Sequence, residues 1–470
     1  MMRSLLRPRI AVLAALVVGT GLLPAAAAQA GPPRAGHAPK KVVTAYFADW
    51  SVYGRGYFVK DIPADKLNVI QYAFGVPTFD AATETPGCDV LDPWADYQMV
   101  YWSGDNTVDG VADNYPDQRL YGAFNQLKKL KAAHPHLKVQ ISLGGWTKST
   151  HFAQVAKTDA RRKAFVAACI DTFIKGNLPT GGWPENAGGP GAAAGLFDGI
   201  DLDWEYPTAV AGGVLEPGPE DRHNATLLAR EFRRQLDALG STTGQHYLLT
   251  AALPAAKSST KYYELRDFVK QLDWVNVMTY DFNVMGGSVA APNTLFTPDP
   301  RDPNADDPTW NTVGTVAYYL AQGVPNHKIV VGVPFYANQY IRSDAGLYGP
   351  FDNTGMDGNS LAWDQKPQPS YHDLVDVAGI LSADGVGQNG FTRNWNAYAG
   401  EPYLFNPAAV HNLASGEVTV ATTICYSDPR SIAERRRLIQ ALGLRGAMAW
   451  ELSQDSDDHA LISELAPLLK

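Results

Sequence analysis

Residues 197–207 read Phe-Asp-Gly-Ile-Asp-Leu-Asp-Trp-Glu-Tyr-Pro, so acidic side chains alternate with bulky apolar ones. Alternate side chains of a β-strand share a face. Asp201, Asp203 and Glu205 therefore point one way, and the apolar residues between them point the other way. The stretch predicts a strand with three carboxyl groups on one face.

Seven further short runs of β-branched or apolar residues are spread along the chain, and helix-like stretches lie between most of them. The runs are residues 42–48, 69–74, 139–144, 248–253, 275–280, 329–334 and 446–450. The helix-like stretches are 123–133, 160–174, 223–239 and 431–442. Strands that alternate with helices indicate a parallel sheet of the α/β class, and eight such units predict a (β/α)8 TIM barrel.

The interval between the seventh and eighth predicted strands is too long for a single helical connection. We expect residues 338–419 to form an inserted α+β lobe beside the mouth of the barrel. The barrel would then comprise residues 42–337, with its first seven strands, and residues 420–470, with the eighth strand and the closing helices. Inside the lobe, short strands are expected at 340–342, 346–348 and 390–393.

The N-terminal residues 1–30 have the composition of an export signal, with three arginines, an apolar run and the small-residue site Ala28-Gln29-Ala30. Residues 31–41 are rich in Gly, Pro and Ala and predict a flexible leader. The apolar run is shorter than the roughly twenty residues that span a bilayer. We therefore expect a secreted, extracellular protein without a membrane anchor.

The overall composition limits which binding partners, disulfides and cofactors are expected. The chain has 39 Lys+Arg against 48 Asp+Glu, a net charge of −9, which argues against binding to nucleic acid. Three cysteines allow at most one disulfide and leave one thiol over. Cys169 lies in a predicted helix and is interpreted as a buried, inert thiol. No Cys-x-x-Cys spacing indicates a metal, and we expect no metal or organic cofactor.

The three carboxyl groups of the acidic strand suggest acid catalysis. Inside a barrel they cannot all stay ionised, because burial and like charge both favour the neutral form. Glu205 lies last, at the carboxyl end of its strand, where barrel enzymes place their active sites. It is the natural candidate for a protonated general acid. A calcium loop is disfavoured because apolar residues stand where such loops carry Gly, Asn and other polar residues.

The full pattern Asp-x-x-Asp-x-Asp-x-Glu, from Asp198 to Glu205, resembles the signature of the glycoside hydrolase family 18 chitinases. Other segments resemble family elements in the right order, and the resemblance covers nearly the whole chain after the leader. They are Ala45-Tyr46-Phe47 with Trp50, Ser142-Leu143-Gly144-Gly145-Trp146, Met278-Thr279-Tyr280-Asp281-Phe282, residues 332–336 and Ala449-Trp450-Glu451. The resemblance implies a chitinase on a TIM barrel.

The resemblance also implies roles for individual residues. Glu205 protonates the glycosidic oxygen, Asp203 orients the acetamido group of the substrate, and Asp201 shares a proton with Asp203. Tyr280 bonds the acetamido carbonyl. Substrate contacts are expected from Asp281, Met278, Trp450, Tyr46, Phe74 and Trp146. Supporting roles are expected for Ser142 beneath the carboxylates, for Gly144 and Gly145 where backbones approach closely, and for Asp198, whose parity turns it away from the interior.

The expected substrates are chitin and N-acetylglucosamine oligomers, cleaved by a monomer through a retaining mechanism in which the substrate assists. The chain departs from many family members at residues 283–287, Asn-Val-Met-Gly-Gly, so we expect different contacts on the leaving-group side.

Two alternative functions stay open. One is an endo-β-N-acetylglucosaminidase, which the inserted lobe disfavours. The other is a chitin-binding lectin without turnover, although such relatives typically lose the glutamate found here as Glu205.

Overall fold

A computed structural model describes residues 41–470 except 210–212 and 358–362. The predicted export signal and the predicted leader up to residue 40 lie outside the described residues. Among the residues that are described, no helix is long and apolar enough to cross a membrane.

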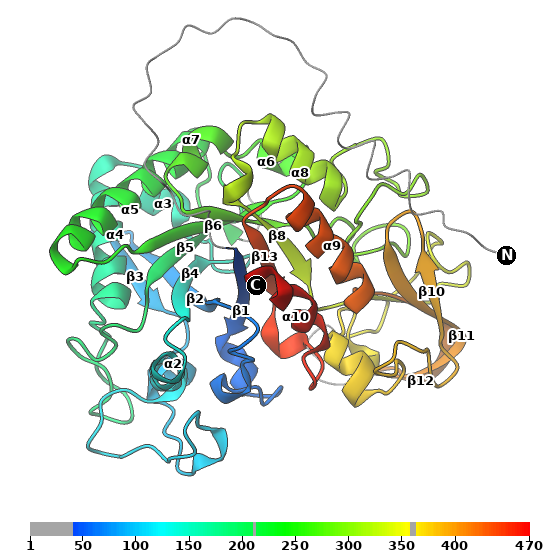
Figure 1. The fold of residues 1–470 in the computed structure, drawn as a ribbon, viewed down its shortest axis with the longest axis horizontal. Coiled ribbons are helices and arrows are strands. Elements are labelled where there is room, and N and C mark those ends of the chain that lie inside the picture. Colours follow the sequence, from blue (N-terminus) through cyan, green and yellow to red (C-terminus); the bar gives the residue numbers. More distant parts are fainter. Residues whose placement is uncertain (1–40, 210–212, 358–362) are drawn as a thin grey trace, which may run out of the picture. The chain divides into compact units, whose positions relative to one another are not determined.

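Eight parallel strands form a closed barrel, which confirms the predicted fold class (Figure 1). Neighbours around the barrel follow the order β1-β13-β8-β7-β6-β5-β4-β2, and pairing of β1 with β2 closes the ring. The strands are β1 (Val42–Ala48), β2 (Val69–Asp80), β4 (Lys138–Gly144), β5 (Gly199–Asp203), β6 (Leu248–Pro254), β7 (Trp274–Met278), β8 (Ile329–Pro334) and β13 (Gly446–Trp450). Each begins within one residue of its predicted start.

The barrel strands are apolar because both of their faces are covered. Every residue of β1, β5 and β8 is buried. One face of each strand packs against the surrounding helices, and the other fills the interior. The register pairs Asp201 with Ser142 of β4 and with Thr250 of β6, so polar side chains from neighbouring strands meet at one level inside the barrel.

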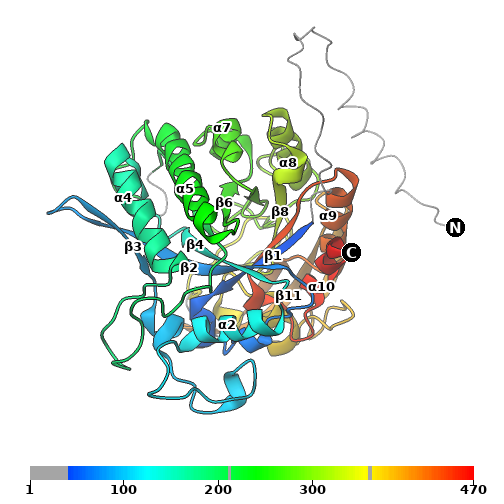
Figure 2. The ribbon, with the colours of Figure 1, turned by 60° about the vertical axis from the view of Figure 1, so that its left-hand side comes forward.

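Helices surround the barrel, and Figure 2 shows α4, α5, α7, α8 and α9 along its outside. The α-helices are α2 (Gly122–Ala133), α3 (Phe152–Ala156), α4 (Asp159–Cys169), α5 (Asp221–Thr243), α6 (Lys257–Thr260), α7 (Leu265–Lys270), α8 (Thr312–Ala321), α9 (Pro429–Ala441) and α10 (Ala460–Leu465). Short 3-10 and π turns include η1 (Asp49–Val52), which follows β1, and η3 (Trp94–Gln98).

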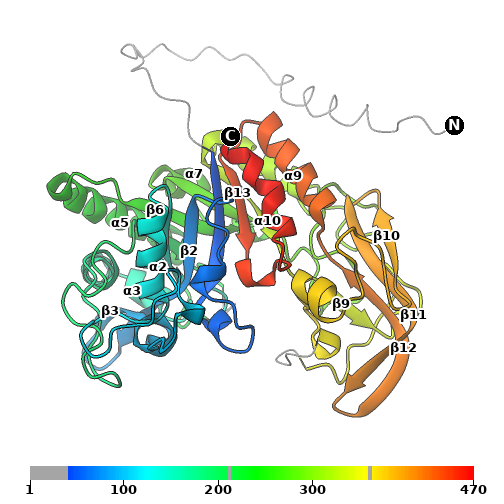
Figure 3. The same ribbon diagram turned by 60° about the horizontal axis from the view of Figure 1, so that its bottom comes forward.

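The inserted lobe is built on a four-stranded antiparallel sheet of order β10-β11-β12-β9, which lies beside the barrel in Figure 3. Its strands are β9 (Asn338–Ile341), β10 (Thr392–Asn396), β11 (Glu401–Leu413) and β12 (Gly416–Cys425). Asn338 at the start of β9 pairs with Cys425 at the end of β12. The buried ion pair between Glu401 of β11 and Arg435 of α9, at 2.5 Å, joins the lobe to the barrel.

The lobe differs from the prediction in three respects. Its two longest strands, β11 and β12, were not predicted; β11 contains Pro402 and Pro407, which weaken a strand pattern. Residues 346–348, expected as a strand, lie in a turn region. The sheet also runs past the predicted boundary at 419, because β12 continues to Cys425.

The cysteines correct a further expectation. Strand β2 continues beyond the barrel into a hairpin with the antiparallel β3 (Thr85–Val90), and Cys88 of β3 forms a disulfide with Cys169 of α4. The interpretation of Cys169 as a free thiol is therefore wrong. The free thiol is Cys425, which is buried in the lobe.

Candidate active site

The three carboxyl groups lie at successive levels of the barrel, and all three are buried. The sequence predicted Glu205 as the last residue of its strand. Strand β5 ends at Asp203, so Glu205 lies two residues beyond it. Pairing with β4 stops at Asp203 and pairing with β6 stops at Leu202. Glu205 thus stands at the carboxyl-terminal mouth of the barrel, on backbone that has left the sheet.

Asp201, the deepest of the three, accepts four hydrogen bonds. Tyr46 and Ser142 donate to Oδ2 at 2.9 Å each, and Thr250 and Asn276 donate to Oδ1 at 2.5 and 3.3 Å. Burial raises the pKa of Asp201, and these bonds oppose the rise. Four donors occupy the four lone-pair positions of a carboxylate. Proton sharing with Asp203 therefore requires one donor to move, and the sharing stays a prediction.

Asp203 and Glu205 are electrostatically different from Asp201. Burial raises the pKa of Asp203 well above its usual range, and the charges of Glu205 and Asp201 raise it further. Its Oδ1 is buried without a hydrogen-bond partner among the described residues. Burial raises the pKa of Glu205 to about 7, while a hydrogen bond from the Tyr206 side chain holds it lower. The surroundings therefore favour the protonated form of both groups.

Tyr280 follows β7, which is separated from the acidic strand β5 by β6 alone. The buried Tyr280 hydroxyl lies 3.8 Å from Sδ of Met448, and Met278 packs against the same core cluster. Burial raises the pKa of Tyr280 well above its usual range, and the charges of Asp203, Asp281 and Glu205 raise it further. Asp281 is exposed and accepts a 2.6 Å hydrogen bond from Tyr336.

Three predicted aromatic contacts gather on one side of the mouth. Ring centroids are 5.1 Å apart for Tyr46 and Trp450, and 5.9 Å apart for Phe74 and Trp450. Trp50 joins them, 6.1 Å from Phe74, and 45% of its surface is exposed. This group offers stacking faces for sugar rings beside the carboxyls.

Trp146 does not join that group. It lies with its ring 6.4 Å from Tyr206, and Tyr206 stacks on Tyr262 at 6.1 Å. Tyr206 bonds Glu205, so this second aromatic group lies next to the acid. Two separate aromatic groups thus accompany the acidic strand, one around Trp450 and one around Tyr206.

The predicted supporting glycines lie where space is smallest. A Cβ on Gly144 would come 2.4 Å from the carbonyl oxygen of Asp203, and one on Gly145 would come 2.7 Å from the ring of Phe74. Both glycines have positive φ, at 105° and 79°, which L side chains rarely adopt. Gly at these positions lets the loop after β4 approach β5.

Asp198 lies just before β5, away from Glu205. Its carboxylate pairs with Lys131 at 2.7 Å and with Lys138 at 3.2 Å, and it accepts the backbone N–H of Val139 at 2.9 Å. These contacts hold the start of the strand.

Sequence reasoning missed several residues of this site. Thr250 and Asn276 looked like ordinary polar residues of strands. Tyr206 lay in the quoted acidic stretch and Tyr336 in the segment 332–336, but neither was given a role. The parity of the strands could have found the first two, since both face the same interior as Asp201.

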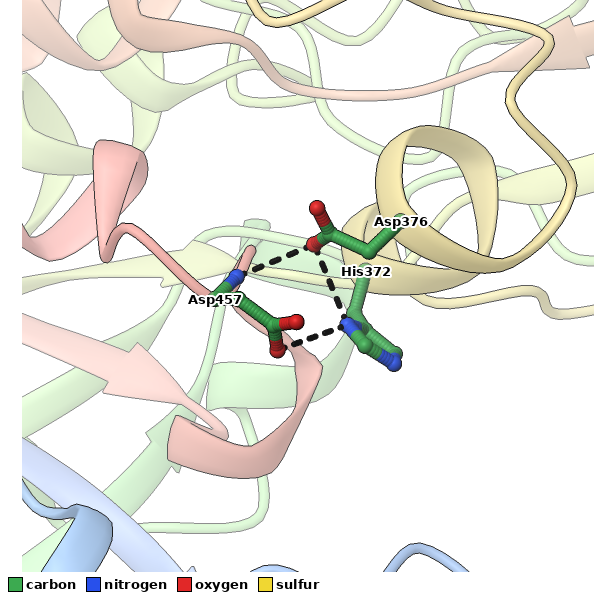
Figure 4. Close-up of side chains that lie close together, drawn as sticks. All are labelled: His372, Asp376 and Asp457. Atoms are coloured by element: carbon green, nitrogen blue, oxygen red, sulfur yellow. Dashed lines mark hydrogen bonds and ion pairs between the residues drawn. The ribbon is translucent and has the colours of Figure 1, made fainter.

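A separate cluster has the composition of a metal site. Within the described residues, His372, Asp376 and Asp457 are the one group of three such side chains with ligand atoms close enough to hold an ion (Figure 4). Nδ1 of His372 lies 3.1 Å from Asp376 and 3.4 Å from Asp457, and Arg55 lies 3.7 Å from Asp457. These side chains already contact one another, so we read the cluster as a contact between lobe and barrel.

The barrel and its acidic strand can be compared with known proteins. The family model described as "Glycosyl hydrolases family 18" matches residues 42–455. The chain belongs to this family. The resemblance predicted from the sequence is therefore confirmed.

Curated relatives include Chitinase A1 of Niallia circulans and Endochitinase 1 of Metarhizium robertsii. The first is 34% identical over 88% of this chain and 56% of its own length, and the second is 30% identical over 89% and 82%. Chitinase C of Streptomyces lividans is matched over 43% of its length. The chain thus spans only about half of some of the longer relatives.

Solved structures of the family agree with the fold. The catalytic domain of chitinase B from Arthrobacter TAD20 superposes with a TM-score of 0.77 at 32% identity, covering 92% of this chain and 95% of that one. A chitinase from Bacillus thuringiensis gives a TM-score of 0.73 at 30% identity, covering 92% and 70%.

Proposed function

We propose that the protein is a secreted chitinase that hydrolyses β-1,4 bonds between N-acetylglucosamine units, with Glu205 as general acid and base. The observation that carries the proposal is the state of Glu205. It is buried at the mouth of the barrel, its pKa is raised to about 7, and the aromatic pair Tyr206 and Trp146 lies next to it. A carboxyl with such a pKa can give and take a proton near neutral pH.

In the first step, Glu205 gives its proton to the glycosidic oxygen, and the bond from that oxygen to the anomeric carbon breaks. The electron pair stays on the leaving oxygen. The 2-acetamido carbonyl oxygen of the substrate attacks the anomeric carbon and closes a cyclic oxazolinium. No second carboxylate on the opposite face is needed, because the substrate supplies the nucleophile.

In the second step, the Glu205 carboxylate takes a proton from a water molecule whose oxygen attacks the anomeric carbon. The oxazolinium ring opens, the acetamido group is restored, and the product keeps the β configuration. Asp203 accepts the amide N–H, and Tyr280 donates to the acetamido carbonyl. The unpartnered buried Oδ1 of Asp203 and the buried Tyr280 phenol, which feels the charges of both carboxyls, support these roles.

The named relatives support chitin and its oligomers as substrates, since they are called chitinases and endochitinases. We infer that the lobe forms one wall of a substrate cleft, which favours a polymer over the glycans of an endo-β-N-acetylglucosaminidase. The presence of Glu205 argues against a lectin. Secretion is proposed from the N-terminal export pattern. The monomeric state is an expectation from the sequence alone.

Hydrolysis of a chromogenic chitobioside tests the proposal. The wild-type chain is expected to turn it over, and Glu205→Gln is expected to lower kcat by at least about 10²-fold, the usual scale for a positioned acid. Binding to insoluble chitin and the circular dichroism spectrum should be unchanged in the variant. Near-normal turnover by Glu205→Gln would refute the assignment, and retained chitin binding without turnover by the wild type would indicate a lectin.

A further inference from the structure

The peptide group that joins Trp204 to Glu205 lies outside the barrel ladder. Pairing of β5 ends at Asp203 on one side and at Leu202 on the other. The backbone that carries the proposed acid therefore has no neighbouring strand to bond its C=O and N–H. Buried backbone groups need partners, and their identity decides how rigidly the acid is held.

Ser149 binds one end of this peptide group. It lies in the loop between β4 and α3 and is fully buried. The N–H of Glu205 donates to Oγ of Ser149 at 2.9 Å. The same Oγ lies 2.9 Å from the carbonyl oxygen of Gly145 and 3.0 Å from that of Asp203, so its own proton is used as well.

Tyr263 binds the other end. It lies between α6 and α7, in the connection that follows β6, and only 3% of its surface is exposed. Its hydroxyl donates to the carbonyl oxygen of Trp204 at 2.5 Å. The indole of Trp204 stacks on Phe152 with centroids 5.3 Å apart, which holds the same residue from its outer face.

We propose that Ser149 and Tyr263 are positioning residues that fix the orientation of Glu205 by clamping the peptide group before it. The two hydroxyls come from loops on opposite sides of β5 and replace the ladder bonds that the strand gives up. Neither side chain needs to touch the substrate. The proposal rests on the proposed role of Glu205 as the acid.

The clamp has a consequence for both rate and proton affinity. Loss of the Ser149 hydroxyl leaves the buried N–H of Glu205 without its partner, and loss of the Tyr263 hydroxyl does the same to the carbonyl of Trp204. The peptide can then turn and carry the carboxyl toward solvent. A misplacement of about 1 Å can cost on the order of 10²-fold in rate. Better solvation also lowers the pKa of Glu205, because burial is its largest cause of elevation.

The test uses Ser149→Ala and Tyr263→Phe in the full chain, assayed on a chromogenic chitobioside from pH 4 to 10. Each variant is expected to lose roughly 10- to 100-fold in kcat with KM changed less than about threefold. The alkaline limb of kcat/KM is expected to move to lower pH. The double variant should lose much less than the product of the two single losses, because both act on one peptide group.

Matched controls separate positioning from stability. Tyr340 in β9 and Ser343 just after β9 are also fully buried. The Tyr340 hydroxyl donates to the backbone carbonyl of Ala291 at 2.8 Å, and the Ser343 hydroxyl donates to the backbone carbonyl of Tyr340 at 3.1 Å. Ser343→Ala and Tyr340→Phe should lower the melting temperature without moving the alkaline limb. If Ser149→Ala and Tyr263→Phe behave like these controls, the clamp is refuted. If Glu205→Gln keeps normal turnover, the proposed function fails first, whatever the clamp variants do.

Discussion

The hydroxyl of Tyr46 on β1 donates to Oδ2 of Asp201 on β5 at 2.9 Å, so a hydrogen bond crosses the barrel interior between strands that are not neighbours. Together with the donors Ser142, Thr250 and Asn276, it opposes the rise in the pKa of Asp201 that burial causes. Asp203, one level nearer the mouth, has no such bond on Oδ1, and burial and the charges of Glu205 and Asp201 all raise its pKa. The hydrogen bonds thus favour the charged form at the deepest carboxyl and not at the one above it.

Replacing the deepest carboxylate should change the pH profile. Asp201→Asn removes a charge that raises the pKa of Asp203, so the acid limb of kcat/KM should move to lower pH, with apparent values that belong to the whole cluster. The control Asp198→Asn removes a carboxylate next to the same strand that bonds Lys131 outside the interior. Its acid limb should stay in place. An unmoved limb in folded Asp201→Asn would show that the carboxyls are not coupled.

Removing the Tyr206 hydroxyl should shift the alkaline limb of the pH profile of kcat/KM. Its hydrogen bond holds the pKa of Glu205 lower than burial alone would. In Tyr206→Phe the pKa of Glu205 rises, the acid stays protonated to higher pH, and the alkaline limb moves upward. Tyr262→Phe, in the ring stacked on Tyr206, should leave the limb where it is. A downward shift in Tyr206→Phe would mean that the ring shields Glu205 more than its hydroxyl bonds it.

The substrate-assisted mechanism makes a stereochemical prediction. Proton NMR of fresh product should detect the β-anomer first, since the acetamido oxygen and then water attack the anomeric carbon from opposite faces. Oligomers without acetyl groups should be nearly inert, by at least about 10²-fold in kcat/KM, because they lack the nucleophile. Their competitive inhibition of chitobioside hydrolysis serves as the control for binding. Initial formation of the α-anomer would rule the mechanism out.

A second buried acidic pair predicts how stability depends on pH. Asp49 of η1 and Asp96 of η3 are 1% and 0% exposed, and each has one oxygen without a hydrogen-bond partner among the described residues. Burial raises the pKa of Asp49 to about 7, and burial and then the charge of Asp49 raise that of Asp96. Since the folded state keeps protons that the unfolded chain loses from about pH 4, stability should fall as pH rises from about 4 to 7.

Asp96→Asn keeps an acceptor for the Tyr72 hydroxyl and removes the titrating group whose pKa is raised by burial and by the charge of Asp49. The variant should lose less stability than wild type between pH 5 and pH 8, by at least about 1 kcal/mol. Melting temperatures at the two pH values check this difference. Asp65→Asn, a surface change, should retain the wild-type dependence. An equal loss in Asp96→Asn and wild type would show that the pair does not hold an extra proton.

The sequence was sufficient to predict the barrel because its strands are buried on both faces and therefore read as short apolar runs. The acidic strand added its own signal, since parity alone puts Asp201, Asp203 and Glu205 on one face. The lobe was harder to predict. Strand β11 contains two prolines and has one solvent-facing side, so its pattern is weak.

Long-range partners could not be predicted from spacing. The pairing of Cys88 with Cys169 depends on a hairpin that carried no clear signal, and 81 residues separate the two. The same holds for Ser149 and Tyr263, which meet the Trp204–Glu205 peptide only because the loops after β4 and β6 fold over the end of β5. Composition gives no hint of such contacts.

The pairing of Asn338 with Cys425 makes the lobe a removable module of the chain. Antiparallel partners lie about 5 Å apart, so a short turn could join residue 337 to residue 426 and close the connection between β8 and α9. Such a deletion would leave Arg435, which is 0% exposed, without its partner Glu401. An apolar replacement such as Arg435→Met would accompany it. The barrel could then be studied with an open mouth, and the contribution of the lobe to the binding of long chains measured by difference.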